Sequence, residues 1–130
     1  MTQDLEKVQG IAILATGKTP SGNELTFAFP EVVEAIGLCT KNQIAVLGVE
    51  IFLVKCDGFY ANGCSDYDLG ITRKWPDVPA GDWVEYVNEN NELAEQCIRR
   101  NPAGDDHVYV LTTASFREHV ELQENRKRRK

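Results

Sequence analysis

The stretch that decides the fold is I-A-V-L-G-V-E-I-F-L-V, residues 44–54. Apolar side chains occupy both sets of alternating positions, and Glu50 is the one charged residue among them. A strand that is apolar on both faces usually lies in the middle of a sheet and is covered on both sides. We therefore expect a central strand. Because an unpaired carboxylate is costly to bury, Glu50 marks either the point where the strand reaches solvent or a partnered carboxylate near a binding face.

Two helices are predicted around this strand. Apolar residues at helical spacing predict the first helix over residues 30–41. Asp82 and Glu85 form a pair typical of a capping box, and Trp83 begins an apolar stripe that is expected to pack the second helix onto the sheet. The run N-P-A-G at residues 101–104 should end it.

Three further segments have the character of strands. The apolar run at residues 8–16 and the alternating pattern at 25–29 predict a hairpin around the turn formers of 17–23. Residues 107–113 are rich in β-forming side chains and predict the last strand. The order β-β-α-β-loop-α-β predicts a single α+β domain over residues 1–116, with an antiparallel or mixed sheet packed against two helices.

Charge is distributed unevenly along the 130 residues, whose formal net charge is −6. Residues 117–130 hold six of the 14 basic and three of the 20 acidic residues, so residues 1–116 have a net charge of −9. An acidic body repels nucleic acid and favours a basic partner. The run R-K-R-R-K at 126–130 could contact nucleic acid or anionic lipid, but residues 117–130 are expected to form a solvated, flexible charged tail.

The chain has the features of a cytoplasmic protein. It contains no apolar run of the roughly 20 residues that a bilayer span requires, and its acidic start does not resemble a secretory signal. The four cysteines lack the close pairs that zinc sites usually contain, so we expect reduced thiols and no metal or other cofactor. They stand at Cys39, Cys56, Cys64 and Cys97.

Nucleotide binding and nucleophilic catalysis are weakly indicated. The run T-G-K-T at residues 16–19 resembles the end of a phosphate-binding loop, but Ala12 stands where that loop needs glycine and Pro20 follows it. The turn of a hairpin explains these residues better. A cysteine–histidine pair would need His107, and a histidine at the start of a strand is more often structural or exposed.

Acidic and aromatic side chains alternate between residues 57 and 82. Aromatic side chains supply large contact areas, and carboxylates pair with lysine or arginine across an interface. A solvated loop with its aromatic rings in the core, or paired carboxylates for acid–base or metal chemistry, remain alternatives. With Glu50 included, the candidate partner-binding residues are Glu50, Asp57, Tyr60, Asp66, Tyr67, Asp68, Trp75, Asp77 and Asp82.

Residues 44–52 resemble the I-P-V-L-G-G-D-V-Y segment of the immunity protein 40 family, small α+β proteins of bacterial polymorphic toxin systems. This chain has Val49 and Glu50 where that pattern has glycine and aspartate. The run D-W-V-E-Y-V at 82–87 is similar to the family's W-x-x-Y-V helix, and residues 108–111 resemble its last strand. The resemblance, over residues 30–113, implies that the protein neutralises a cognate toxin by tight binding without catalysis.

The sequence therefore predicts an immunity protein that binds a basic toxin in the bacterial cytoplasm, with a nuclease-type domain as one candidate for that toxin. It is expected to bind neither nucleic acid nor membrane. Many intracellular toxins are nucleases, and an acidic inhibitor is steered electrostatically toward a basic cleft. The alternatives are a small carboxylate- or metal-dependent hydrolase, which would need converging carboxylates, and a scaffold or adaptor module. A homodimer formed through an exposed sheet edge is a further expectation for such a module.

Overall fold

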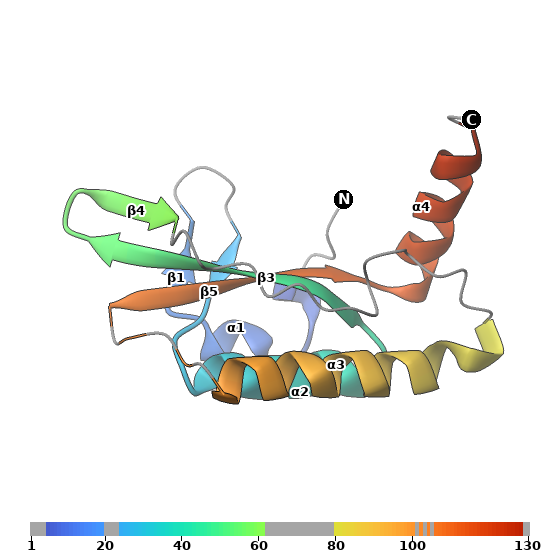
Figure 1. Cartoon of the computed structure of the whole chain (residues 1–130), viewed down its shortest axis with the longest axis horizontal. Helices are drawn as coiled ribbons and strands as arrows, with labels where there is room; N and C mark the ends of the chain where they lie inside the picture. Colours follow the sequence, from blue (N-terminus) through green and yellow to red (C-terminus); the bar gives the residue numbers. More distant parts are fainter. Residues whose placement is uncertain are drawn as a thin grey trace.

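The central strand predicted from the sequence lies in the middle of the main sheet. The computed structural model of the chain describes residues 5–19, 24–61, 80–100, 102, 104 and 106–128. Strand β3 (Ala45–Lys55) pairs antiparallel with β4 (Gly58–Ala61) on one side and with β5 (His107–Ala114) on the other. Cys56 and Asp57 form the turn that joins β3 to β4. The described strand order is therefore β4-β3-β5 (Figure 1).

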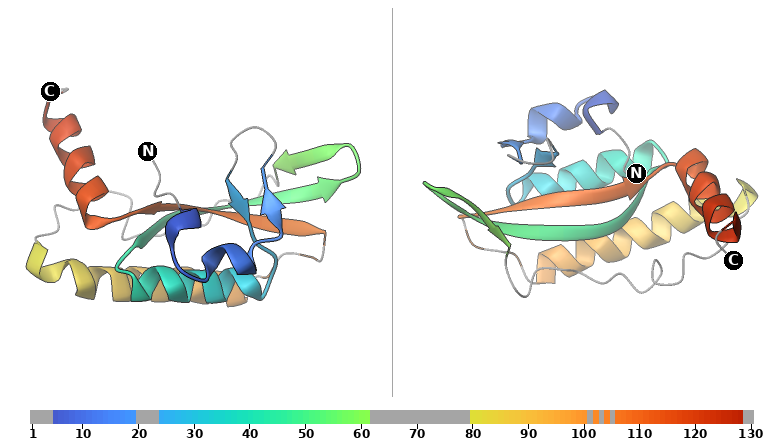
Figure 2. Two further views of the ribbon diagram at one scale, coloured as in Figure 1. Left: turned by 180° about the vertical axis from the view of Figure 1, so that it is seen from behind. Right: turned by 90° about the horizontal axis from the view of Figure 1, so that it is seen from above.

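Two helices lie along one face of this sheet. Helix α2 (Glu31–Lys41) and helix α3 (Trp83–Arg100) run side by side beneath the strands (Figures 1 and 2). Both helix predictions are thereby confirmed, with the ends shifted by one or two residues, and the fold is α+β as expected. The core between helices and sheet is built from buried apolar side chains, among them Val32, Ile36, Cys39, Val46, Val49, Ile51, Ala94, Ile98, Tyr109 and Leu111.

The pairing of β3 with β5 contains a bulge that changes which residues share a face. Val46 lies opposite Thr113 and Gly48 opposite Thr112, so Leu47 is the extra residue. As a result Val46 joins Val49 in the main core, although strict alternation had put them on opposite faces. Glu50 is exposed, so it is not a partnered buried carboxylate. The prediction that β3 is fully covered on both faces is wrong at this position.

A tight turn connects α2 to β3. Gln43 has a positive φ of 59°, and the N–H groups of Gln43 and Ile44 donate to the carbonyls of Thr40 and Cys39, at 3.1 and 2.8 Å. This is the Schellman arrangement, which usually places glycine in the left-handed position. Trp83 donates its indole N–H to the carbonyl of Gln43 at 2.8 Å. The turn is therefore held by its own backbone hydrogen bonds and by a hydrogen bond from the Trp83 side chain.

The buried stripe of α3 includes two asparagines. Its buried residues recur at helical spacing: Trp83, Val87, Asn90, Asn91, Ala94 and Ile98. Asn91 accepts from the N–H of Val46 at 2.9 Å and donates to the carbonyl of Ile44 at 2.8 Å, while Asn90 donates to the carbonyl of Val46 at 2.7 Å. These amides bond to the backbone at the start of β3, whereas β4 pairs only with Phe52 to Lys55 at its end. Helix α3 thus protects an edge of the sheet.

The predicted strand at residues 8–16 is wrong. A 3₁₀ turn, η1 (Leu5–Lys7), leads into the short helix α1 (Ile11–Leu14). Leu5, Val8 and Ile11 are buried at intervals of three residues, whereas Ile13 is 88% exposed. A strand would have buried Ile11 and Ile13 together, so the burial has the period of a helix. The apolar run alone does not reveal this.

The hairpin itself is present but begins later in the chain. Strand β1 (Gly17–Lys18) pairs antiparallel with β2 (Leu25–Thr26), so residues predicted to be turn contribute a strand. Phe27 then exchanges backbone hydrogen bonds with Tyr109 of β5, at 2.9 and 2.7 Å. This bridge attaches the N-terminal segment to the main sheet.

Residues 116–128 form a helix where we predicted a flexible tail. Helix α4 (Phe116–Arg128) begins with a capping box: Ser115 Oγ accepts from the N–H of Glu118 at 3.3 Å, and Glu118 Oε1 accepts from the N–H of Ser115 at 2.9 Å. His119 is 1% exposed, and its ring lies 5.1 Å from that of Trp83. The boundary proposed at residue 116 therefore separates parts that pack together.

Candidate functional surface

The structure describes four of the nine predicted partner-binding residues, and it does not gather them on one surface. Asp57 lies in the β3–β4 turn and Asp82 in the 3₁₀ turn η2 (Ala80–Asp82) that precedes α3. These two elements lie at opposite ends of the long axis of the molecule (Figure 1). Glu50 is in mid-strand, and the backbone of Tyr60 lies in β4. Outside the described residues are Asp66, Tyr67, Asp68, Trp75 and Asp77.

A row of carboxylates runs along the outer side of α3. Its members, which we call the α3 carboxylate row, are Asp82, Glu85, Glu89 and Glu92, and all four are exposed. They recur at intervals of three or four residues, which places them on one side of the helix, over about 15 Å at 1.5 Å per residue. No lysine or arginine occurs between Asp82 and Glu92; the basic residues of α3 are Arg99 and Arg100, in its last turn. The row is therefore a continuous acidic surface.

The row is costly for the isolated helix. Like charges three and four residues apart destabilise a helix by about 0.2–0.5 kcal/mol per pair. Glu95 lies beside the row, and burial raises its pKa above the usual value. The positive charge of Arg99 lowers this pKa, and repulsion from Glu92 raises it. The N-terminal helix dipole offsets the charge of Asp82 and Glu85 within the first turn only. Helix stability alone therefore does not account for Glu89 and Glu92.

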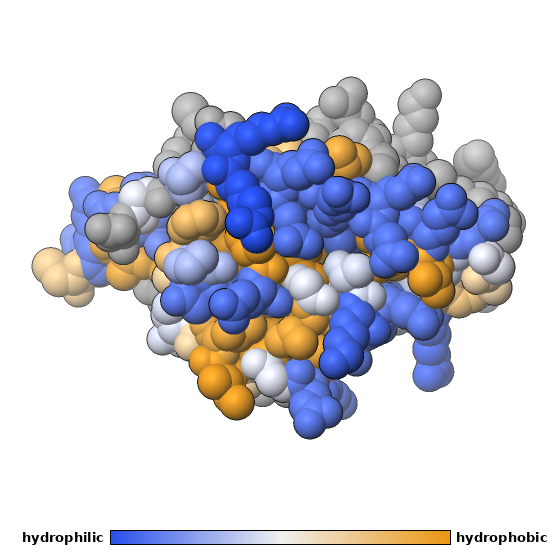
Figure 3. All heavy atoms as spheres, turned by 90° about the horizontal axis from the view of Figure 1, so that it is seen from below, coloured by the Kyte–Doolittle hydropathy of each residue, from blue (hydrophilic) through white to orange (hydrophobic). Residues whose placement is uncertain are grey.

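Apolar side chains are exposed beside this acidic surface. On α3, Val84 is 47% exposed and Leu93 is 40% exposed. Figure 3 views the helical layer from below, where hydrophilic residues dominate over α3 and hydrophobic ones gather at the margin where α1 lies. Ile13 of α1 is 88% exposed. Single exposed apolar side chains are common on protein surfaces, so these residues alone do not mark a binding site.

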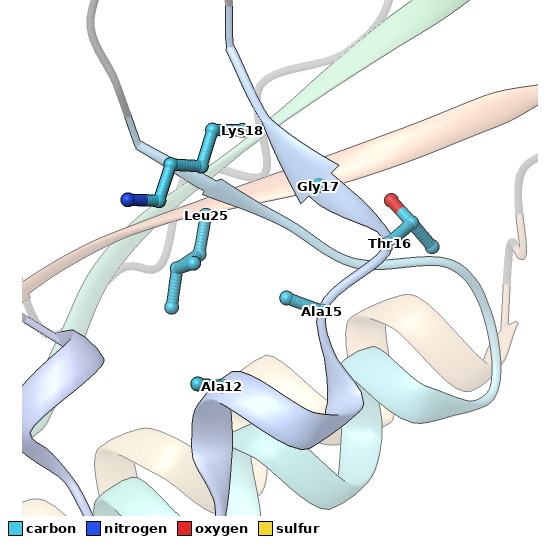
Figure 4. A pocket seen from close by; sticks show the side chains of 6 residues that line it. All are labelled: Ala12, Ala15, Thr16, Gly17, Lys18 and Leu25. Carbon is cyan, nitrogen blue, oxygen red and sulfur yellow. The ribbon is translucent and has the colours of Figure 1, made fainter.

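A pocket of about 420 Å³ lies beside the β1–β2 hairpin (Figure 4). Its lining consists of Ala12, Ala15, Thr16, Gly17, Lys18 and Leu25, and it includes no carboxylate. Gly17 and Lys18 belong to a strand, and α1 precedes them in the chain, whereas a phosphate-binding loop needs a helix after its lysine. The run T-G-K-T therefore belongs to a hairpin, as expected, but Gly17 and Lys18 form its first strand and not its turn.

Two other kinds of site are absent from the described ranges. No three histidine, cysteine, aspartate or glutamate side chains lie together there as ligands of a metal ion would. No helix in the described part of the chain has both the length and the apolar composition to cross a membrane.

Sequence reasoning had cited Glu85 only as part of a cap and did not identify Glu89 or Glu92. Their spacing of three and four residues would have placed them on one side of the predicted helix.

No protein-family model, curated protein or solved structure matches this chain.

Proposed function

We propose that this protein is an inhibitor that binds a basic partner protein, in the manner of a bacterial immunity protein bound to its toxin. The α3 carboxylate row carries the proposal. It lies on a body whose net charge is −9 over residues 1–116, and it presents four carboxylates without an intervening basic residue. Such a surface attracts a cationic cleft and accelerates association at low ionic strength.

Binding would proceed in two physical stages. The row first orients the partner through long-range attraction, which salt screens over about 8 Å at physiological ionic strength. Val84 and Leu93 are then covered as the surfaces meet, and they supply the apolar contact that charge pairs alone do not provide. The resemblance to the immunity protein 40 family motivates a toxin as the partner. Steric blocking of a basic cleft requires no catalytic residue.

The test begins with affinity purification of the tagged chain from its native cells at low and moderate salt. A co-purifying protein with a basic C-terminal domain is then expressed alone and together with this chain, and cell growth is measured. We expect growth arrest by the partner alone and rescue by the wild-type chain. The triple variant E85K/E89K/E92K should bind at least about 100-fold more weakly, because attraction becomes repulsion at three positions.

The matched control reverses three exposed carboxylates outside α3, Glu24, Glu34 and Glu121, and so makes the same change in net charge. It should retain rescue and most of the affinity. Equal loss in both triple variants would mean that net charge matters and the row does not. Full rescue by E85K/E89K/E92K would remove the row from the interface.

A further inference from the structure

The pocket beside the β1–β2 hairpin has an apolar wall where α1 ends. Ala12 and Ala15 form this wall, and their Cβ atoms point toward the side on which Leu25 lies (Figure 4). The residue before Ala12, Ile11, is buried in the core, so the larger side chain is used for packing. Because alanines face the hairpin, α1 leaves the space of about 420 Å³ that a longer apolar side chain would fill.

The opposite wall of the pocket comes from the hairpin and combines an apolar side chain with a charged one. Lys18 and Leu25 are directly opposite each other in the pairing of β1 with β2. Their side chains therefore share one face of the hairpin, with Cβ atoms about 4.5–5.5 Å apart. Leu25 is 9% exposed, whereas Lys18 is exposed. A lysine stem is apolar and its ammonium group is charged, so this wall is apolar beneath a cation.

The other polar side chain in the described lining is already engaged. The hydroxyl oxygens of Thr16 and Thr26 lie 2.8 Å apart, and the N–H of Thr16 donates to the carbonyl of Thr26 at 2.7 Å. Among the six described lining residues, only Lys18 is charged. Residues 8–17 contain no charged side chain, so the wall from α1 does not repel an anion. The pocket therefore suits a ligand with an apolar body and one negative charge.

A volume of about 420 Å³ is within the roughly 300–1,000 Å³ that is usual for sites of small molecules. We propose that this pocket binds a medium-chain fatty acid such as octanoate. Its aliphatic chain lies against Ala12, Ala15 and Leu25, and its carboxylate pairs with the ammonium group of Lys18. The inference goes beyond the proposed function, because none of these residues belongs to the α3 carboxylate row.

The test is a titration of the full-length chain, labelled with ¹⁵N, with sodium octanoate, followed by two-dimensional ¹H–¹⁵N NMR. The amide signals of residues 12–18 and 25 should shift and saturate. Butanoate has four methylenes fewer and should bind at least about 10-fold more weakly, since each fully buried methylene strengthens binding about 4-fold. Octan-1-ol has the chain without the charge, and it should bind about 5-fold more weakly than octanoate.

Three variants separate the charge from the apolar wall. Lys18→Gln should weaken octanoate binding about 5-fold, the upper end for an ion pair exposed to solvent, and should leave octan-1-ol binding unchanged. Lys41→Gln, at an exposed lysine at the end of α2, is the matched control and should change neither affinity. Ala12→Leu fills the pocket from an exposed position of α1 that accommodates leucine, and it should weaken both ligands at least about 10-fold.

The ¹H–¹⁵N spectrum of each variant also shows that the variant is folded. The proposal is overturned if octanoate does not saturate the wild-type chain at millimolar concentrations, or if the shifts fall outside residues 12–18 and 25. Equal octanoate affinity of Lys18→Gln and the wild type, or unchanged binding by Ala12→Leu, would overturn it as well. Since no partner protein is present, none of these results bears on toxin binding.

Discussion

Replacing Asn91 with leucine should destabilise the fold far more than the same change at Asn88. Asn91 is fully buried and makes hydrogen bonds with both its carbonyl and its amide. Leucine has the same branching as asparagine and favours helix slightly more, so helix propensity changes little, and its larger methyl groups can only add to the destabilisation. What changes is that the N–H of Val46 and the carbonyl of Ile44 lose these partners. Thr40 also loses a bond of 3.0 Å, but its hydroxyl still donates to Ile36.

The expected magnitude follows from the two backbone groups. Each buried polar group left without a partner costs about 1–3 kcal/mol, so Asn91→Leu should lower the free energy of unfolding by about 3 kcal/mol. Unfolding entropy is about 2.1 cal/mol/K per residue, or about 0.27 kcal/mol/K for this length, which converts the loss to a Tm decrease of about 11 °C. Asn88 is exposed on the same helix, and Asn88→Leu should change stability by less than about 0.5 kcal/mol.

The assay is urea unfolding followed by far-ultraviolet circular dichroism on the wild type and the two variants. The m-value should stay constant, because the surface exposed on unfolding hardly changes. A difference between Asn91→Leu and Asn88→Leu below about 1 kcal/mol would refute the reasoning, since it would mean that water or backbone adjustment satisfies Ile44 and Val46 without the amide.

Three further predictions concern the turn after α2, a cysteine and a carboxylate. Gln43→Gly should raise stability by about 0.5–1 kcal/mol in the same urea assay, because glycine adopts the left-handed conformation without steric cost. Burial raises the pKa of Cys39 to about 12, so alkylation at pH 8 followed by peptide mapping should modify exposed Cys56 rapidly and Cys39 only after unfolding. Burial also raises the pKa of Glu95, so the stability that protonated Glu95 contributes is lost as pH rises through its folded-state pKa. Glu95→Gln should therefore be more stable than the wild type at pH 7 in the same urea assay. The difference should disappear near pH 3, where Glu95 is protonated.

The sequence alone predicted the central strand, both long helices and the last strand, because each has a strong period over many residues. It failed where the signal is short. The bulge at Leu47 reverses the alternation of β3 and leaves no trace in the apolar pattern. The run at residues 8–16 is apolar at enough positions to fit either a strand or a helix.

The remaining differences depend on contacts that the local sequence does not specify. Asn90 and Asn91 occupy stripe positions of α3, but an asparagine in a buried stripe is explained only by the strand edge beside it. The start of α4 could have been predicted, since Ser115 and Glu118 have the spacing of a capping box. The many charged residues that follow favoured a flexible tail instead. The candidate binding residues were sought in the acidic-aromatic segment, whereas the described carboxylates gather on α3.

The hydrogen bonds between α3 and the start of β3 have a consequence for recognition. Trp83 and the two asparagines bond to backbone groups within four consecutive residues, Gln43 to Val46. Three anchors spaced along one helix fix both its rotation about its axis and its position along that axis. The carboxylates on its outer side are therefore preorganised before any partner arrives, and binding at this surface would order side chains only, at about 0.5–1.5 kcal/mol for each one immobilised. Removing these hydrogen bonds would slow association with a partner, although none of the residues that contact the partner would have changed.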